Sequence, residues 1–439
     1  MSNEEAPGPL SVRRVLGWSA GSLAANAFNT LPALLLLIYL TDALGVSAAL
    51  AGVVVAVPKL FDVVISPWLG AISDREAIRT GRRRRLMVAG ASVLPFAFVL
   101  TFSAPAHGSA AALWVFFAFI LTSAAYLCFQ VPFMALPAEM TPLPDERTRL
   151  MTWRTLFFTV GMLIGGVVGP LLTKGDNPGT YQRMSLVIGA FLLALLAVPV
   201  LSTRWVRSRP SGGALSLPQA LRAVRGNRPF ALAVAVFFVK LILTGMTIAG
   251  LPYMATYYLG GRSHQAVVFV AFTVVGAVSV PGAGALVRNW GKPRVLSASM
   301  ALWAVAGCAM YPAVKTGVAP TAVLGAVLGV AFAGLQVSLF AMLPESIRLS
   351  AERSGKDQAG AFSGVWTAVD TAGHALAPLC FTVVLTVTGY ASSTLAHPVT
   401  QTPLAREGIL LGFSVIPSLL LLAAIPLVRA YGRAVRAAS

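Results

Sequence analysis

Two stretches of the sequence, Gln130-Val-Pro-Phe-Met-Ala-Leu-Pro-Ala-Glu139 and Gln336-Val-Ser-Leu-Phe-Ala-Met-Leu-Pro-Glu345, each end a long apolar segment. A Glu-Arg pair follows both stretches, at Glu146-Arg147 and at Glu352-Arg353. The Gln, the Val, the Glu and both members of the pair recur at one constant offset of 206 residues. Five matches at one offset indicate an internal duplication, in which the second half of the chain repeats the first.

The chain around these stretches is too apolar for a water-facing surface. Of its 439 residues, 57% are hydrophobic and 11% are charged, whereas soluble domains average about 25% charged residues. Runs near 20 apolar residues suit a hydrocarbon core of about 30 Å. We therefore predict a polytopic α-helical membrane protein, and exclude a soluble enzyme, a secreted disulfide scaffold and a disordered chain. Twelve apolar segments are predicted at 16–40, 48–73, 86–104, 110–137, 152–173, 184–203, 230–259, 265–287, 295–314, 319–343, 359–388 and 407–428.

The basic residues predict the orientation of these segments. Of the 33 Lys and Arg, 26 lie at the two termini and in the connectors on their side, five lie in the other connectors, and two lie inside segments. Positive charge accumulates on the cytoplasmic side of membrane proteins. We therefore expect a bacterial inner-membrane protein with both termini on the cytoplasmic side. The net charge of +18 is thus a topological signal, and we expect no nucleic-acid partner.

The longest polar connector separates two sets of six segments. It spans 204–228 and is rich in Arg, Ser, Gly and Pro, as expected for a linker. We predict a bundle of six helices at 1–203, this cytoplasmic linker, and a second bundle at 229–439. The offset of 206 joins segment 4 to segment 10, which is the relation that a parallel duplication of six helices requires. Two parallel six-helix repeats resemble the architecture of the major facilitator transporters.

Charged residues inside the segments need a reason, because a charge at the centre of a membrane helix costs at least about 2.5–3.5 kcal/mol. At about 1.5 Å per residue, Asp62, Lys240 and Asp370 lie about 15–16 Å deep. Lys59 shares a helix face with Asp62, and His374 shares one with Asp370. We interpret the four residues Asp62, Lys59, Asp370 and His374 as a cation-coupling set. A local ion pair and a hydrogen-bonded structural pair are the alternatives.

Lys240 has no charged neighbour on its own segment, so it must pair across helices or contact an anionic substrate. We favour a structural or gating pair with Asp370. Trp366 lies one turn before Asp370, where an indole suits either a sugar ring or core packing. The segment 2 exit carries Gly70, which would allow close helix packing, and Asp74, which could bond the start of the next helix.

Three motifs resemble the glycoside–pentoside–hexuronide:cation symporters, the melibiose-permease-like branch of the major facilitator superfamily. The first is Phe61-Asp62-x₄-Pro67-x-x-Gly70-x-x-Ser-Asp74-Arg75, followed by Gly81 and four arginines. The second is Pro132-Phe-x-Ala-Leu-x-Ala-Glu139-x-Thr141, followed by Asp145-Glu146-Arg147-Thr-Arg149 and Arg154. The third is Ser354-Gly-Lys356…Gly360-x-Phe362…Trp366-x₃-Asp370. Thr41-Asp42 after segment 1 also fits this family.

The resemblance implies cation-driven import, usually of sugars, by alternating access. It implies that Asp62 is the centre of the coupling site and that Arg154 is a gating arginine. The family's sugar-binding acids fall here at Asn26 and Gln130, its second acid on helix 2 falls at Ser66, and its helix 11 lysine at Thr371. A single carboxylate is a poor sodium site, so we expect protons rather than Na⁺.

We therefore expect a secondary active transporter, a proton-coupled (or sodium-coupled) symporter that imports a sugar, a glycoside or a similar small polar solute. The alternative is a proton-driven exporter or carrier of an amphiphilic metabolite, drug or lysolipid. No enzymatic activity, metal, cofactor or partner beyond the substrate and the bilayer is expected, and we expect a monomer. The predicted substrate pocket comprises Asn26, Tyr126, Gln130, Arg154, Lys240, Gln336 and Trp366. The predicted gating residues are Asp74, Arg75, Glu139, Arg147, Glu345 and Arg353.

Overall fold

The computed structural model describes residues 10–141, 143–173, 177–206, 227–354, 359–394 and 399–436. Within them, twelve helical segments are long and apolar enough to cross a membrane, which confirms the predicted number. The first six are α1 (Val12–Ile38) with its π-helical turn η1 (Tyr39–Ala43), α2 (Ala48–Thr80), α3 (Arg84–Thr101), α4 (Gly108–Met140), α5 (Pro144–Leu172) and α6 (Pro178–Ser202). The second six are α8 (Arg228–Tyr258), α9 (Arg262–Trp290), α10 (Lys292–Thr316), α11 (Val318–Ser354), α12 (Ala359–Val387) and a last span built of α13 (Pro403–Leu410), η2 (Leu411–Val415), α14 (Ile416–Ala423) and α15 (Ile425–Arg436).

Several helices continue beyond the apolar windows of the sequence. Helix α2 runs seven residues past 73, and α11 runs 11 residues past 343. Charged residues such as Lys, Arg and Glu are good helix formers, so a helix need not end where its apolar stretch ends. Helix α2 ends where Gly81 takes a left-handed conformation with φ of 64°, as is common after a helix C-terminus.

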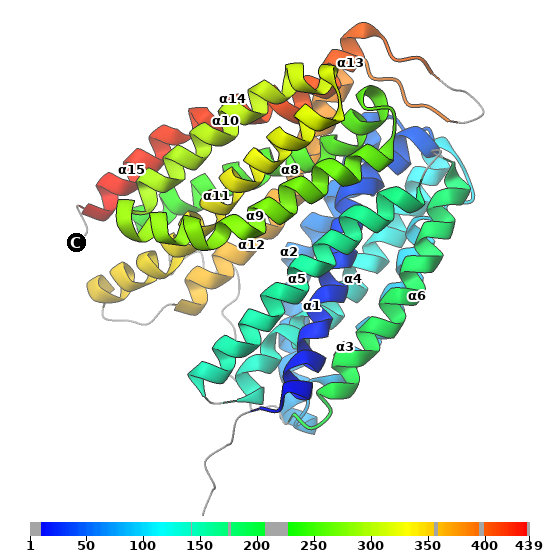
Figure 1. Ribbon diagram of the computed structural model, residues 1–439. Coiled ribbons are helices and arrows are strands. Elements are labelled where there is room, and N and C mark those ends of the chain that lie inside the picture. Colours follow the sequence, from blue (N-terminus) through cyan, green and yellow to red (C-terminus); the bar gives the residue numbers. More distant parts are fainter. Residues whose placement is uncertain are drawn as a thin grey trace, which may run out of the picture.

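The helices pack as two groups, which we call the N half (α1–α6) and the C half (α8–α15). In the N half α1 packs on α5, and α3 on α4; in the C half α8 packs on α12, and α10 on α11. The halves meet where α2 packs on α12 and α5 on α9. Twelve spans bring Val12 and Arg436 to one face, which we call the terminal face. The halves converge near α13, on the opposite face, and diverge toward the terminal face (Figure 1).

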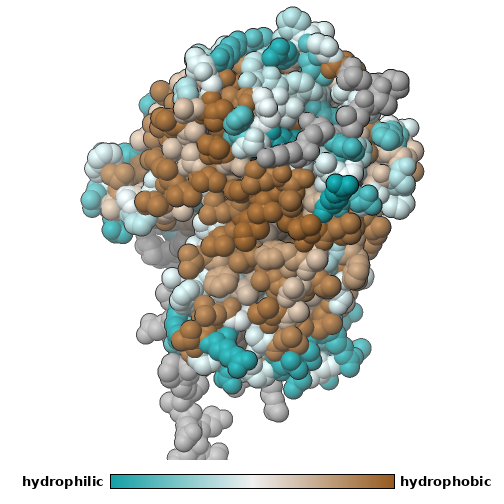
Figure 2. All heavy atoms as spheres, turned by 45° about the vertical axis from the view of Figure 1, so that its right-hand side comes forward, coloured by the Kyte–Doolittle hydropathy of each residue, from teal (hydrophilic) through white to brown (hydrophobic). Residues whose placement is uncertain are grey.

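The surface has the pattern of a membrane protein. Large apolar side chains such as Phe96, Val278 and Val387 are exposed, and Figure 2 shows such side chains gathered in a broad belt between hydrophilic ends. Exposed apolar side chains are favourable where the surrounding solvent is hydrocarbon. Most of the predicted linker, 207–226, lies outside the described residues.

Two glycines allow the halves to approach closely. A Cβ added at Gly52 of α2 would lie 2.2 Å from Thr382 Oγ1 of α12, and one at Gly166 of α5 would lie 2.0 Å from the Phe269 ring of α9. Both contacts would be lost with any larger residue, because overpacked side chains force helices apart. Gly70 differs from the expectation for it, because an added Cβ there meets nothing within 4 Å.

Gly52→Leu should push α2 away from α12 and shift the protein toward a conformation that is open at the opposite face. The shift is measured as faster alkylation of a cysteine placed at Thr382, one of the two contacting positions. Gly70→Leu is the matched control, on the same helix but in open space, and should leave alkylation unchanged. Equal rates in both variants would contradict a role for this crossing in closing the opposite face.

Candidate functional site

An ion pair lies within the N half, at the position predicted from the sequence. Lys59 Nζ is 3.4 Å from Asp62 Oδ2, one turn further along α2. Asp62 is buried, and a buried carboxylate is stable as an anion only with a charged or hydrogen-bonding partner. Lys59 therefore stabilises the charged form of Asp62.

Lys59 is also surrounded by aromatic rings. Its Nζ lies 5.9 Å from the ring centre of Phe28, 5.7 Å from that of Phe119 and 5.6 Å from that of Tyr126. An ammonium group within about 6 Å of a ring is attracted by its π electrons. These rings hold the lysine in a fixed place while leaving it only one carboxylate, Asp62, within the described part of the chain.

Tyr126 connects this pair to the predicted substrate pocket. Its hydroxyl accepts a hydrogen bond of 2.7 Å from Asn29 Nδ2 on α1. The charges of Asp62, of Arg154 on α5 and of Asp370 on α12 act electrostatically on this hydroxyl. Charged residues of both halves therefore act on the Tyr126 hydroxyl, and Asp370 lies 244 positions from Tyr126 in the sequence.

Two residues of the predicted pocket offer buried polar atoms. Gln130 Oε1 and Arg154 Nε are buried, and neither has a hydrogen-bond partner in the described part of the chain. Buried polar atoms are nearly always hydrogen-bonded in proteins, so an acceptor and a donor here suit a polar ligand. Asn26 instead donates to the carbonyl of Phe158 over 2.8 Å and ties α1 to α5.

In the C half, Lys240 binds a residue other than the expected one. Its Nζ donates to Gln336 Oε1 over 2.7 Å and lies 4.4 Å from the ring centre of Phe332. Among the described residues it forms no ion pair with Asp370, although that carboxylate acts on it electrostatically. The predicted Lys240–Asp370 pair is therefore absent in this conformation, and the amide of Gln336 solvates the buried ammonium in its place.

Trp366 has features of both interpretations that the sequence left open. Its ring stacks on Phe237 of α8 at a centroid distance of 4.0 Å, which is core packing between α8 and α12. Its indole Nε1 is buried and has no hydrogen-bond partner among the described residues. One face of the indole is thus used in packing, and its N–H remains a potential donor to a ligand.

Asp370 and His374 are more exposed than expected. Their side chains are 46% and 63% exposed, and His374 Nδ1 is 3.9 Å from Asp370 Oδ1. The sequence places both residues deep in a membrane-spanning segment, yet in this conformation their side chains are not buried by the protein. Ser363, Thr367 and Thr371 lie on the same strip of α12, one turn apart. Because a strip of five polar residues is unfavourable against lipid, we infer that it faces water between the halves.

A third cluster, which we call the terminal-face network, joins two predicted gating residues through a residue that the sequence analysis missed. Arg83 binds Asp74 at the end of α2, and its Nε is 2.7 Å from Glu139 Oε1 of α4. Burial opposes the charge on Arg83, but the carboxylates of Glu139 and Asp74 outweigh burial and raise its pKa. The sequence offered only a partial signal, since Arg83 is one of four consecutive arginines after Gly81 and no local pattern distinguishes it from the other three.

The equivalent position of the C half uses different partners. Glu345 corresponds to Glu139 at the offset of 206. Its Oε2 lies 3.0 Å from Lys292 Nζ and accepts a hydrogen bond of 2.7 Å from the Tyr431 hydroxyl. Arg147 Nε donates to the carbonyl of Thr141, and Arg75 is exposed. The side chain of Arg353 lies outside the described residues.

The opposite face is held by a cluster that we call the tyrosine latch: Thr41, Asp42, Tyr253, Tyr257 and Tyr390. Asp42, in the π-helical turn of the N half, accepts hydrogen bonds from Tyr257 over 2.9 Å and from Tyr390. Thr41 donates to Asp42, so the 2.9 Å bond between Thr41 and Tyr253 has the tyrosine as donor. Burial and the nearby carboxylate raise the pKa of Tyr390, which keeps this hydroxyl a donor.

The hydrogen bonds between the halves are confined to this face in the described part of the chain. Besides the latch, Ser393 N donates to Thr41 O, Ser392 Oγ donates to Val46 O, and Arg262 donates to Thr173 Oγ1. All of these residues lie at helix ends remote from Val12 and Arg436. These hydrogen bonds hold the halves together at the opposite face, and the helices of the two halves diverge toward the terminal face (Figure 1).

Arg83→Gln should destabilise the N half, because it removes the cation that joins Asp74 and Glu139. Loss of one partner of a buried ion pair costs about 3–5 kcal/mol, so the midpoint of thermal unfolding in detergent should fall clearly. Arg79→Gln, an exposed arginine of the same helix end, is the control and should change the midpoint little. A midpoint equal to that of Arg79→Gln would contradict a structural role for Arg83.

Tyr390→Phe should weaken the tyrosine latch, because a hydrogen bond to a charged group contributes about 1.5–3 kcal/mol. The protein should then populate conformations open at the opposite face at least about tenfold more. Distances between spin labels on the two halves measure this shift. Tyr258→Phe, on α8 but outside the latch, should leave the distances unchanged; the same distances in both variants would refute the latch.

The chain as a whole resembles known transporters. The model of the family described as MFS/sugar transport protein matches residues 17–432. The uncharacterized symporter YnaJ of Bacillus subtilis is 25% identical over 95% of this chain and 90% of its own. The glucuronide carrier protein homolog of Escherichia coli is 25% identical over 93% and 90%.

A solved structure has the same fold. The bacterial homologue of the human lysosomal transporter Spinster, crystallised in an inward-facing conformation, superposes with a TM-score of 0.72 at 14% identity, over 97% of each chain. The fold class predicted from the sequence, two six-helix bundles of the major facilitator type, is thus confirmed. The relatives are membrane transporters and not enzymes. From the match over residues 17–432, this chain belongs to the MFS/sugar transport protein family.

Proposed function

We propose that this chain is a proton-coupled symporter that imports a sugar, a glycoside or a similar small polar solute by alternating access. The observation that carries the proposal is the position of Tyr126. One side of its ring lies near Lys59, which pairs with Asp62, and Arg154 and Asp370 act on the same residue. A change in the charge of Asp62 would therefore change the electrostatic potential at Tyr126, which belongs to the proposed substrate pocket.

Proton coupling is supported by the composition of the ion site. Hard cations such as Na⁺ prefer several oxygen ligands, whereas Asp62 is paired with the ammonium of Lys59. Protonation of Asp62 would release Lys59 toward the surrounding rings and the pocket, and deprotonation would restore the pair.

The pocket residues support a neutral or weakly anionic polyhydroxylated substrate. Gln130 offers an acceptor, Arg154 offers a donor, and Trp366 offers an indole N–H. Hydroxyl groups both donate and accept, so a sugar could satisfy all three groups at once. Among the relatives, the name of the glucuronide carrier homolog agrees with a glycoside-like substrate.

We further propose that the terminal face is cytoplasmic and that the protein acts as a monomer in a bacterial inner membrane. The 26 basic residues on that side support the orientation. The opening toward the terminal face is then an opening toward the cytoplasm. This conformation would release an imported substrate into the cell.

Uptake into proteoliposomes with an imposed pH gradient tests the proposal. We expect accumulation of at least one labelled solute from a panel of glycosides, uronides and pentoses, and its loss when a protonophore collapses the gradient. A Na⁺ gradient in place of the pH gradient should not drive it. Accumulation with Na⁺ alone would refute proton coupling, and extrusion by the same gradient would refute import.

Asp62→Asn should abolish gradient-driven accumulation, because the amide binds no proton at this position, while exchange of labelled for unlabelled substrate persists. We expect a loss of accumulation of at least about tenfold. Asp62→Glu keeps the carboxyl group and should retain part of the activity. Intact accumulation in Asp62→Asn would exclude Asp62 as the coupling residue.

A further inference from the structure

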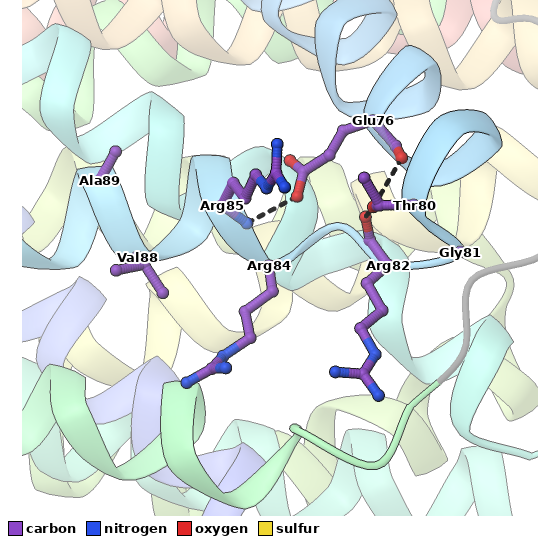
Figure 3. A pocket seen from close by; sticks show the side chains of 8 residues that line it. All are labelled: Glu76, Thr80, Gly81, Arg82, Arg84, Arg85, Val88 and Ala89. Carbon is purple, nitrogen blue, oxygen red and sulfur yellow. Dashed lines mark hydrogen bonds between the residues drawn. The ribbon is translucent and has the colours of Figure 1, made fainter.

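A cavity of about 850 Å³ opens on the terminal face, where α2 ends and α3 begins. It is separate from the Lys59–Asp62 pair, which lies about five turns earlier on α2. Figure 3 shows Arg82 and Arg84 extending side by side from the connector, with Glu76 and Arg85 across from them. Its lining includes Glu76, Arg82, Arg84, Arg85, Val88 and Ala89.

The four consecutive arginines at this connector divide into two kinds. Arg83 turns into the protein and binds Asp74 and Glu139. Arg82, Arg84 and Arg85 border the cavity, and none of them forms an ion pair with a carboxylate of the described residues. Three guanidinium groups at one cavity predict an anionic ligand, since arginine binds phosphate and carboxylate oxygens in a bidentate manner.

Two details show that the cavity is built for more than solvation of surface charge. Arg84 Nε is buried and has no hydrogen-bond partner in the described part of the chain. Glu76 is the one acidic residue in the lining of the cavity. Its carboxylate accepts hydrogen bonds from the backbone N–H groups of Arg85, over 2.6 Å, and of Leu86, over 3.2 Å. Its carboxylate caps the start of α3 and is not paired with the three guanidinium groups.

The cavity continues into an apolar strip. Val88 and Ala89 lie one turn inside the arginines, and the exposed residues Val93, Phe96 and Leu100 follow Ala89 on α3. Spacings of four, three and four residues place them on one helix face. A soluble anion would need only the arginines, whereas a phospholipid needs cations at the headgroup and an apolar surface for its acyl chain.

We propose that this cavity binds the headgroup phosphate of an anionic phospholipid, with an acyl chain along the exposed face of α3. The guanidinium groups of Arg82, Arg84 and Arg85 bind the phosphate oxygens. Clusters of basic residues at the membrane boundary attract anionic lipids. The lipid lies beside the terminal-face network, because Arg83 belongs to the same run of arginines.

Competition binding on the purified full-length protein in an uncharged detergent tests the proposal. A fluorescent phosphatidylglycerol is bound and then displaced by unlabelled phosphatidylglycerol, phosphatidylcholine, inorganic phosphate or glycerol 3-phosphate. We expect phosphatidylglycerol to compete at least about tenfold better than each of the others. Equal competition by inorganic phosphate would overturn the lipid assignment in favour of a soluble anion, and equal competition by phosphatidylcholine would overturn the need for a net negative charge.

The variant Arg82→Gln/Arg84→Gln/Arg85→Gln should bind phosphatidylglycerol at least about tenfold more weakly. The matched control, Arg429→Gln/Arg433→Gln/Arg436→Gln, removes three basic residues of the same face at α15 and should retain the affinity. Ala89→Trp, which narrows the cavity at an exposed lining position without changing charge, should also weaken binding. Equal losses in the two triple variants, or full binding in both Ala89→Trp and the first triple variant, would overturn the proposal.

Discussion

The structure depends on the rule that a charge buried between membrane helices must have its partner within the protein, because hydrocarbon offers none. Three buried charges satisfy this rule in different ways. Asp62 has the ammonium of Lys59, Lys240 has an amide and an aromatic ring, and Asp42 has two tyrosine hydroxyls. Ions, amides and hydroxyls differ in how much interaction energy they lose when the buried group they contact gains or loses a proton. Among these three, the Lys59–Asp62 pair is the one in which both partners are ions, so it loses the most attraction when its carboxyl group is neutralised.

The internal duplication preserved one position and diversified its partners. Glu139 and Glu345 correspond at the offset of 206; Glu139 is the second-last residue of α4, whereas α11 continues for nine residues beyond Glu345. Glu139 binds an arginine that is nearly inaccessible, whereas Glu345 binds a half-buried lysine and a tyrosine. A buried arginine with two carboxylates is costly to disrupt, and a more exposed lysine pair is weaker. The two halves therefore have the same helix arrangement with unequal stability at the terminal face.

The fold could be predicted from the sequence almost entirely, and the site only in part. Apolar runs determine spans because length and hydropathy are local properties, and the repeat determines their arrangement. The pair Lys59–Asp62 was also predictable, since both residues share one helix. Contacts between helices could not be predicted in this way. Lys240 donates to Gln336 and does not pair with Asp370, and the latch around Asp42 joins residues far apart in the chain. The exposure of Asp370 depends on how far the two halves separate, and local sequence patterns do not predict that separation.

The crossing of α2 and α12 at Gly52 lies close to one end of a long helix. Only four residues separate it from Ala48, and 28 residues separate it from Thr80, which is about 6 Å on one side and about 42 Å on the other. The crossing therefore acts as the fulcrum of an unequal lever. A rotation of about 10° there would move the Thr80 end by about 7 Å and the Ala48 end by about 1 Å. A change in the size of the side chain at Gly52 should therefore change the separation of the halves more at the Thr80 end of α2 than at its Ala48 end.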